Sequence, residues 1–149
     1  MQQGSQINLK AAGVVALAVA AAVLWGPRLW HNDVQVCQRV FAGLVRGDEG
    51  IHDAIDWEHL SAMGVEAGKT FAALPNDWER TRYKQMFIAG FAKGFAENGA
   101  KASDFTGWRV RERNGEQTLV AADYASKGKT LLLGLSHAGG GKLTSIQWQ

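Results

Sequence analysis

Hydrophobic and polar positions follow three patterns along this chain, and each pattern predicts a different kind of element. Residues 11–26 are an apolar run without a charged side chain. Between residues 36 and 97 apolar residues recur mostly at intervals of three or four, which is typical of amphipathic helices. From Trp108 onward apolar and polar residues alternate, as in half-buried strands. Helices followed by strands predict an α+β domain behind a hydrophobic N-terminal segment.

The apolar run predicts a single transmembrane helix, which we place at residues 11–30 after a short tail of residues 1–10. Its uncharged part is somewhat shorter than the roughly 20 residues that span a bilayer, so flanking apolar residues have to extend it. Trp25 and Trp30 follow at its C-terminal end, where aromatic side chains typically lie at the membrane interface. The remainder, residues 34–149, suffices for one compact domain.

The composition of this anchor indicates contact with other membrane helices. It is rich in alanine and therefore only weakly favoured in bare lipid. Small residues recur at every fourth position, Ala12, Ala16 and Ala20, and this spacing lets a second helix approach closely. We expect other membrane-protein subunits, and membrane lipid, to bind this segment, including Trp25 and Trp30. Small-x-small triplets in the same run also fit a peptidase site, so a cleaved export signal is the alternative.

The domain is expected to begin with three helices. The first covers Val36–Val45, and a shorter second one covers Ile51–Met63, followed by an irregular connection over residues 64–75. The third begins at Asn76, which has the form of an N-cap with a carboxylate three residues on. Asn98 and the glycine after it supply the stop signal of that helix.

An aromatic stripe marks one face of the third helix. Its members recur at four-residue steps and are Tyr83, Phe87, Phe91 and Phe95. Such a stripe predicts a face that packs into the core. Gly90 and Gly94 lie beside it, and they would let another element approach closely.

Four strands joined by short turns are expected after the helices. Trp108–Arg113 leads through an Asn-Gly turn, a strong hairpin signal, into a strand over residues 118–125. Two further strands cover residues 130–137 and 143–148. Sequential strands with short turns form an antiparallel meander. The predicted fold class is therefore α+β, with helices packed on a curved four-stranded antiparallel meander behind the transmembrane helix.

Element order and three stretches of sequence resemble the nuclear transport factor 2-like superfamily. These stretches are FAGLVRGDEGIHDAIDW, YKQMFIAGFAKGF and the terminal LTSIQWQ. The resemblance implies a cystatin-like α+β cone that can enclose a cavity. It also implies a single-pass protein of the bacterial inner membrane with a periplasmic domain, because the superfamily includes membrane-anchored components of type IV secretion systems. Its other members include isomerases, dehydratases and dimerisation modules, so it leaves the function open.

Composition and charge narrow the function classes only slightly. The charged fraction of 20% and the net charge of +2 do not indicate a nucleic-acid-binding protein. The single cysteine, Cys37, cannot form an intrachain disulfide. No phosphate-binding glycine loop, Cys-x-x-Cys pair or nucleophile elbow is present in the sequence. We therefore expect no nucleic-acid partner and no cofactor.

Three arginines alternate along the first predicted strand and would share one face of it: Arg109, Arg111 and Arg113. Such a row fits anionic lipid headgroups or an acidic partner protein. A solvated face or a charged edge strand explains the same row without any partner.

Two weaker sets of residues suggest chemistry. Isomerase-like chemistry inside a cone needs a carboxylate base and a hydrogen-bond donor, and Tyr83, Asp123 and His137 are the available groups. No motif brings them together, and Asp123 and Tyr124 point to opposite sides of a strand. A second set forms an i, i+4, i+7 pattern that would suit zinc on a continuous helix: His52, Asp56 and His59. A polar outer helix face explains this second set equally.

The leading hypothesis is a non-enzymatic, membrane-anchored accessory or assembly subunit of a larger membrane complex. It rests on the small-residue anchor and on the lack of an assembled catalytic set in the sequence. The alternative is a small-molecule-binding or isomerase-like enzyme that uses the cone cavity.

Overall fold

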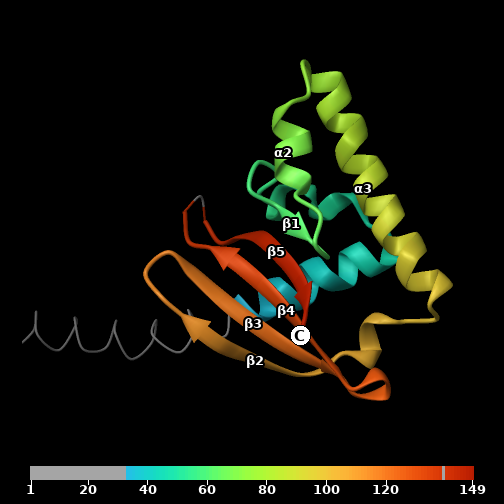
Figure 1. Ribbon diagram of the computed structural model, residues 1–149, viewed down its shortest axis with the longest axis vertical. Coiled ribbons are helices and arrows are strands. Elements are labelled where there is room, and N and C mark those ends of the chain that lie inside the picture. Colours follow the sequence, from blue (N-terminus) through green and yellow to red (C-terminus); the bar gives the residue numbers. More distant parts are fainter. Residues whose placement is uncertain (1–32, 139) are drawn as a thin grey trace, which may run out of the picture. The chain divides into compact units, whose positions relative to one another are not determined.

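The computed structural model describes residues 33–138 and 140–149 (Figure 1). The chain divides into two units, Met1–Asn32 and Asp33–Gln149. The predicted tail and anchor, with Ala12, Ala16, Ala20, Trp25 and Trp30, lie outside the described residues. Within the described part, no helix has both the length and the apolar character needed to span a membrane.

The second unit confirms the predicted α+β class, and its sheet has five strands in the order β1-β5-β4-β3-β2. The four C-terminal strands form the predicted antiparallel meander: β2 (Thr106–Arg113), β3 (Gln117–Tyr124), β4 (Lys129–Ser136) and β5 (Lys142–Trp148). The prediction of four strands was wrong, because β1 (Ser61–Ala62) pairs in parallel with the free edge of β5. The result is a mixed sheet.

Four helical segments lie within residues 33–97. They are a helix at residues 33–46, the 3₁₀ helix η1 (Glu49–Ala54), α2 (Ala67–Ala72) and α3 (Asp77–Glu97). Asn76 caps α3 as predicted, since its side chain accepts a 2.9 Å hydrogen bond from the Glu79 amide. Gly99 has a φ of 66°, a left-handed conformation that glycine adopts readily at the end of a helix. A short 3₁₀ turn, η2 (Ala102–Asp104), lies between α3 and β2, and another, η3 (Ala125–Lys127), lies between β3 and β4.

The predicted second helix over residues 51–63 was wrong beyond Ala54. Ile55 has an extended backbone and bridges to Leu143 of β5, so the helical hydrogen-bond ladder stops there. Trp57 then turns into the core, and its indole Nε1 donates a 2.9 Å hydrogen bond to the His52 carbonyl. Part of the connection predicted as irregular is the helix α2.

The core lies between the helix at residues 33–46 and one face of the sheet. Phe41 is its centre, because its ring contacts the rings of Phe95, Phe105 and Trp108 at centroid distances of 5.5, 4.6 and 5.9 Å. Alternate residues of β3 and β4 enter the same core, and two residues of β5 on either side of an irregularity join them: Val120, Ala122, Leu131, Leu133, Leu135, Leu143 and Ile146.

The aromatic stripe of α3 packs against this core, as predicted, but none of its four rings is fully buried. Ile88 is the one fully buried residue of α3. One flank of the helix therefore stays uncovered within the described part of the chain.

Candidate functional site

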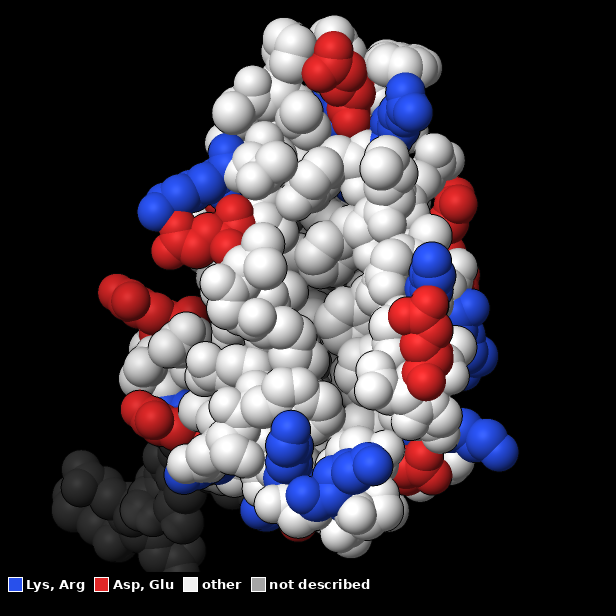
Figure 2. All heavy atoms as spheres, turned by 45° about the vertical axis from the view of Figure 1, so that its right-hand side comes forward, with Lys and Arg blue, Asp and Glu red and all other residues white. Residues whose placement is uncertain are grey.

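A groove of about 490 Å³ runs along the uncovered flank of α3. Its walls are α3 from Gly90 to Asn98 and the turn at Met63, and Trp148 of β5 lies at one end. We call it the α3 groove. Figure 2 shows this hollow on a face with few charged side chains, and basic side chains gather at its lower end.

Stacked aromatic rings form the apolar lining of the α3 groove. Phe91 and Phe95 are stacked with centroids 4.9 Å apart, and Phe95 is stacked on Trp148 at 6.5 Å. Trp148 in turn is stacked on Tyr124 at 6.1 Å. Trp148 is 37% exposed although it belongs to this stack. Rings that are fixed on one side and open on the other are suited to contact a further apolar group.

The helix wall of the groove has bare backbone at two positions one turn apart. A methyl group added to Gly90 or Gly94 would meet no atom within 4 Å, so neither glycine is required by packing inside the domain. A glycine inside a helix costs about 1 kcal/mol of stability relative to alanine. The fold therefore gives up stability at this wall and leaves its surface flat.

The opposite wall is held in an unfavourable conformation. Met63 has a φ of 50°, and it is the one non-glycine residue of the described chain with a positive φ. It forms a tight turn with Gly64, closed by two reciprocal 2.9 Å hydrogen bonds between Ala62 and Val65. Asparagine, aspartate and glycine are the usual residues of such turns, and a left-handed bulky residue costs roughly 1–3 kcal/mol. The side chain so placed lines the groove.

Positive charge stands at the end of the groove near β4. Lys127 and Lys129 line it there, and no acidic side chain does. The ammonium group of Lys129 lies 5.7 Å from the centre of the Trp148 ring. The lining thus combines an apolar aromatic surface with a cationic end.

Sequence reasoning did not find this groove, although it identified the stripe and both glycines. The missing wall comes from the turn at Met63, nearly thirty residues before Phe91, in a segment predicted as helix. A Met-Gly pair between two short apolar runs was the available signal, but methionine is not a typical turn residue.

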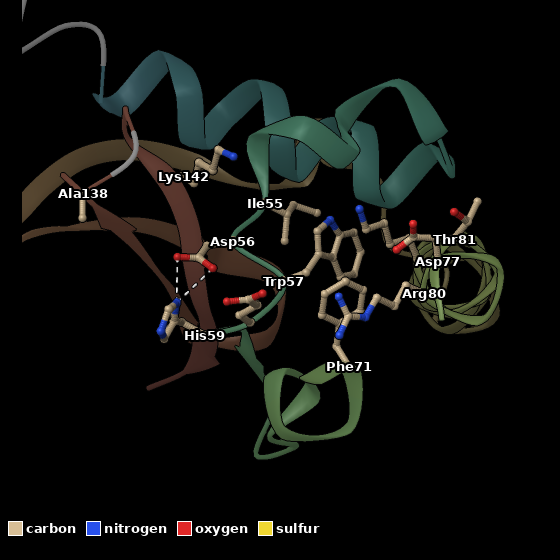
Figure 3. Close-up of a pocket in the computed structure, with 12 residues that line it drawn as sticks. Ile55, Asp56, Trp57, His59, Phe71, Asp77, Arg80, Thr81, Ala138 and Lys142 are labelled. Atoms are coloured by element: carbon tan, nitrogen blue, oxygen red, sulfur yellow. Dashed lines mark hydrogen bonds and ion pairs between the residues drawn. The ribbon is translucent and has the colours of Figure 1, made fainter. Parts of the chain in front are cut away.

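A second, more polar pocket of about 640 Å³ lies between residues 55–59, α2 and the start of α3, and Ala138 and Lys142 also line it. In Figure 3, Arg80 lies over the ring of Phe71, and Asp56 faces His59. Lys84 approaches the rings of Trp57 and Phe71 at 5.9 and 5.5 Å. Cations and carboxylates both line this pocket, so it shows no preference for one sign of ligand charge.

The proposed zinc set is not assembled. His59 Nδ1 lies 3.0 Å from both carboxylate oxygens of Asp56, whereas His52 contacts the Glu49 carbonyl at 2.9 Å and Asp53 at 3.1 Å. Positions i, i+4 and i+7 share one face only on a continuous helix, and this helix ends at Ala54, before Asp56. Among the described residues, no group of three His, Cys, Asp or Glu side chains is placed to hold a metal ion.

The three candidate catalytic residues lie at different places in the fold. The Tyr83 hydroxyl donates to the Ala67 carbonyl at 3.3 Å. Asp123 lies on the outer sheet face and binds Arg109 at 2.7 Å, while Tyr124 points into the core, as the alternation predicts. The Arg109 guanidinium lowers the pKa of Asp123 below its usual value, mainly through this hydrogen bond. His137 contacts the Thr118 hydroxyl at 2.7 Å, at the start of β3, whereas Asp123 lies near the end of that strand.

The three arginines do not share one strand face, contrary to the prediction. Arg109 pairs with Ala121 on the outer face, whereas Arg113 pairs with Thr118, which has the parity of the core-facing residues of β3. An irregularity between Val110 and Glu112 inserts Arg111 and shifts the alternation by one residue. Arg111 is exposed.

Arg113 belongs to a partly buried polar network at the start of the domain. Its guanidinium pairs with Asp33, and the fully buried Thr118 hydroxyl donates a 2.8 Å hydrogen bond to the same carboxylate. His137 Nε2 lies 2.7 Å from that hydroxyl. The network joins the first described residue of the chain to β2, β3 and the residue that follows β4.

No protein-family model matches this sequence, and no curated protein or solved structure matches it at a significant level. The resemblance to the nuclear transport factor 2-like superfamily therefore stays a prediction.

Proposed function

We propose that this chain is a non-enzymatic accessory subunit of a membrane protein assembly, and that its folded domain docks a partner protein in the α3 groove. One observation carries the proposal: four locally unfavourable features meet at one surface. They are the two helix-interior glycines Gly90 and Gly94, the left-handed Met63, and the exposed flank of the aromatic stack. Violations of local preference that cluster in space are typical of functional surfaces.

The chemistry of the lining supports a protein partner. Aromatic residues and methionine are enriched in the buried centres of protein interfaces, and Trp148, Phe91 and Met63 are of these types. Because Gly90 and Gly94 have no side chains, the backbone of a partner can approach this wall closely. Natural proteins give up stability where a function requires it, and the stability cost at these groups is of that kind.

The predicted anchor provides the second part of the proposal. Residues 11–30 hold the domain at the bacterial inner membrane, with the domain in the periplasm, and their small-residue face packs against helices of the same assembly. Exposed Arg111 on β2 is available to anionic lipid headgroups or to an acidic neighbour.

Photo-crosslinking in native membranes tests this function. A benzophenone side chain replaces Phe91 in the groove of the full chain, and a matched variant carries it at Ala89, which is exposed on another face of α3. We expect a discrete adduct with a partner protein from position 91 only, and we expect Gly94→Leu to remove it. The absence of a protein adduct from the groove, or equal adducts from both positions, would refute docking in the groove.

The anchor has its own test. Removal of residues 1–30 should release the chain from the membrane fraction and abolish recovery of the partner at the endogenous concentration. If the shortened chain still sediments with membranes, the anchor assignment is wrong, whatever the result of crosslinking.

A further inference from the structure

Building on the proposed function, we infer that the occupant of the α3 groove is a short amphipathic helix of the partner. Its apolar side chains lie on the aromatic lining, and acidic side chains at one end of it lie beside Lys127 and Lys129. The inference concerns the chemistry of the partner, which the proposed function leaves open.

The length of the groove fits a helix of a few turns. The wall from Gly90 to Asn98 extends about 12 Å at 1.5 Å per residue. Two turns of a partner helix have the same length and present apolar residues at positions i, i+3 or i+4, and i+7 to one groove. Three apolar anchors of this kind match the three apolar surfaces available, which are Phe91, Phe95 and Trp148.

The glycine wall favours a helix over a bulky side chain alone. Packed helices lie roughly 8–10 Å apart, and the distance depends on the side chains at the contact. With hydrogen atoms in place of Cβ at Gly90 and Gly94, a partner helix can lie at the short end of this range. Dispersion contacts then extend along both backbones.

Met63 makes the second wall adaptable. Methionine is unbranched and flexible, and it fills irregular gaps against different partner side chains. The turn that carries Met63 is anchored by a 2.8 Å hydrogen bond from its amide to the Ile146 carbonyl. The side chain can therefore adjust while its backbone stays in place.

The charge of the groove defines the polar end of the partner. Lys127 and Lys129 form no ion pair within the described part of the chain, and the groove has no acidic lining residue. Aspartate or glutamate at the facing end of a partner helix complements this charge, whereas lysine or arginine there is repelled. Complementarity of this kind determines orientation and specificity more than affinity.

A fatty acyl chain with an anionic head shares part of this chemistry, but the shape of the groove favours a protein. Sites for small ligands usually bury about 70–90% of the ligand surface. Here Gly90 is exposed, Gly94 is half-buried and Trp148 is 37% exposed, so an acyl chain would stay largely in water. A helix covers such an open groove and keeps its own polar face in solvent.

Selection from a peptide library tests the inference. The full chain, immobilised through its C-terminus, is exposed to displayed 14-residue helices whose surface positions are randomised. We expect enriched peptides to combine an i, i+3 or i+4, i+7 apolar face with Asp or Glu at one end. Gly94→Leu should weaken their binding at least about tenfold by overfilling the groove, whereas Ala89→Leu should leave it unchanged. Oleate serves as the competing lipid probe.

The two lysines have a separate expected signature. Lys127→Gln combined with Lys129→Gln should weaken the acidic peptides roughly 3- to 10-fold and remove most of the salt dependence of binding. Neither change touches the core, so a loss of folding does not explain the result. Urea unfolding of each variant confirms this.

Several outcomes would overturn the inference: no enrichment, enrichment of neutral or basic helices, equal binding to Gly94→Leu, or displacement of every peptide by one equivalent of oleate. Failure of the inference differs from failure of the proposed function. If position 91 crosslinks to a partner in membranes while acidic helices show no preference, the docking function stands and only the partner chemistry is wrong.

Discussion

Replacing both groove glycines by alanine should stabilise the free chain. Gly90 and Gly94 lie in the interior of α3, and a methyl group at either position would meet no atom within 4 Å. The substitutions therefore bring the helix propensity of alanine without a steric penalty. Each should contribute about 0.8–1 kcal/mol to the free energy of unfolding, and the double variant about 2 kcal/mol.

The magnitude is large enough to measure. For a domain of about 120 residues, 1 kcal/mol raises the melting temperature by about 4 °C, so the double variant should melt about 8 °C higher. With a urea dependence of roughly 1.5 kcal/mol per M, the unfolding midpoint should rise by about 1.3 M. Tryptophan fluorescence reports the transition, since Trp57, Trp108 and Trp148 all contact other rings of the core or groove.

Gly68→Ala is the matched control with the opposite sign. Gly68 also lies in a helix, but a methyl group there would collide with the Glu58 carbonyl and approach the Leu60 amide, both of them backbone atoms. This substitution should destabilise the chain by roughly 1–3 kcal/mol. If the variant with alanine at both Gly90 and Gly94 is no more stable than the wild type, packing inside the domain does require these glycines. The inference that they lower the stability of the free chain is then refuted.

Three further predictions concern single side chains. Met63 packs partly against the core, so Met63→Asn is compared with Met63→Ala, which loses the same packing. The asparagine variant should be more stable than the alanine variant by about 1 kcal/mol, because asparagine tolerates the left-handed conformation, and equal unfolding midpoints would contradict this. Cys37 is buried, and its burial together with the nearby Asp33 carboxylate raises the pKa of the thiol. A thiol reagent at pH 8 should therefore modify it only at the rate of unfolding, and rapid labelling of the native chain would contradict its burial. Arg109 lowers the pKa of Asp123, so this pair stabilises the fold above the usual carboxyl value of 3.8 and ceases to do so as the pH falls through the lowered value. The stability difference between wild type and Asp123→Asn should accordingly be present at pH 7 and vanish in acid, as chemical denaturation across pH will show.

Local signals predicted the long elements of the fold. The Asn76 cap, the Asn98-Gly99 stop and the Asn114-Gly115 hairpin all rest on interactions between residues close in sequence, and α3 and the meander were predicted from them. These signals belong to single elements and do not depend on what packs against them.

Elements decided by distant partners were missed. β1 is two residues long and exists because β5 offers a free edge, which no pattern around Ser61 indicates. The helix predicted over residues 51–63 ends at Ala54 because Ile55 pairs with Leu143, almost ninety residues away. In the same way, the strand shift around Arg111 depends on the register with β3 and moved Arg113 to the inner face.

Of the α3 groove, the sequence predicted the wall formed by α3 but not the wall formed by the turn at Met63. The aromatic stripe and the glycines beside it are visible as spacing, and their packing against a core was correctly expected. The position of the turn at Met63 decides which flank of α3 stays open. That position depends on tertiary contacts, which local sequence does not show. Periodicity identifies an apolar face, but the neighbours of that face decide how much of it is covered.

The polar network at Asp33 has a mechanical consequence. Tension arriving from the preceding residues enters the domain at Asp33, whose carboxylate is held by Arg113 and Thr118 from two different strands. The load is thus shared with the sheet at its point of entry, because both contacts tie the start of the helix at residues 33–46 to β2 and β3. A pulling force along the chain would therefore be resisted first by these polar contacts, before it acts on the packing of the hydrophobic core.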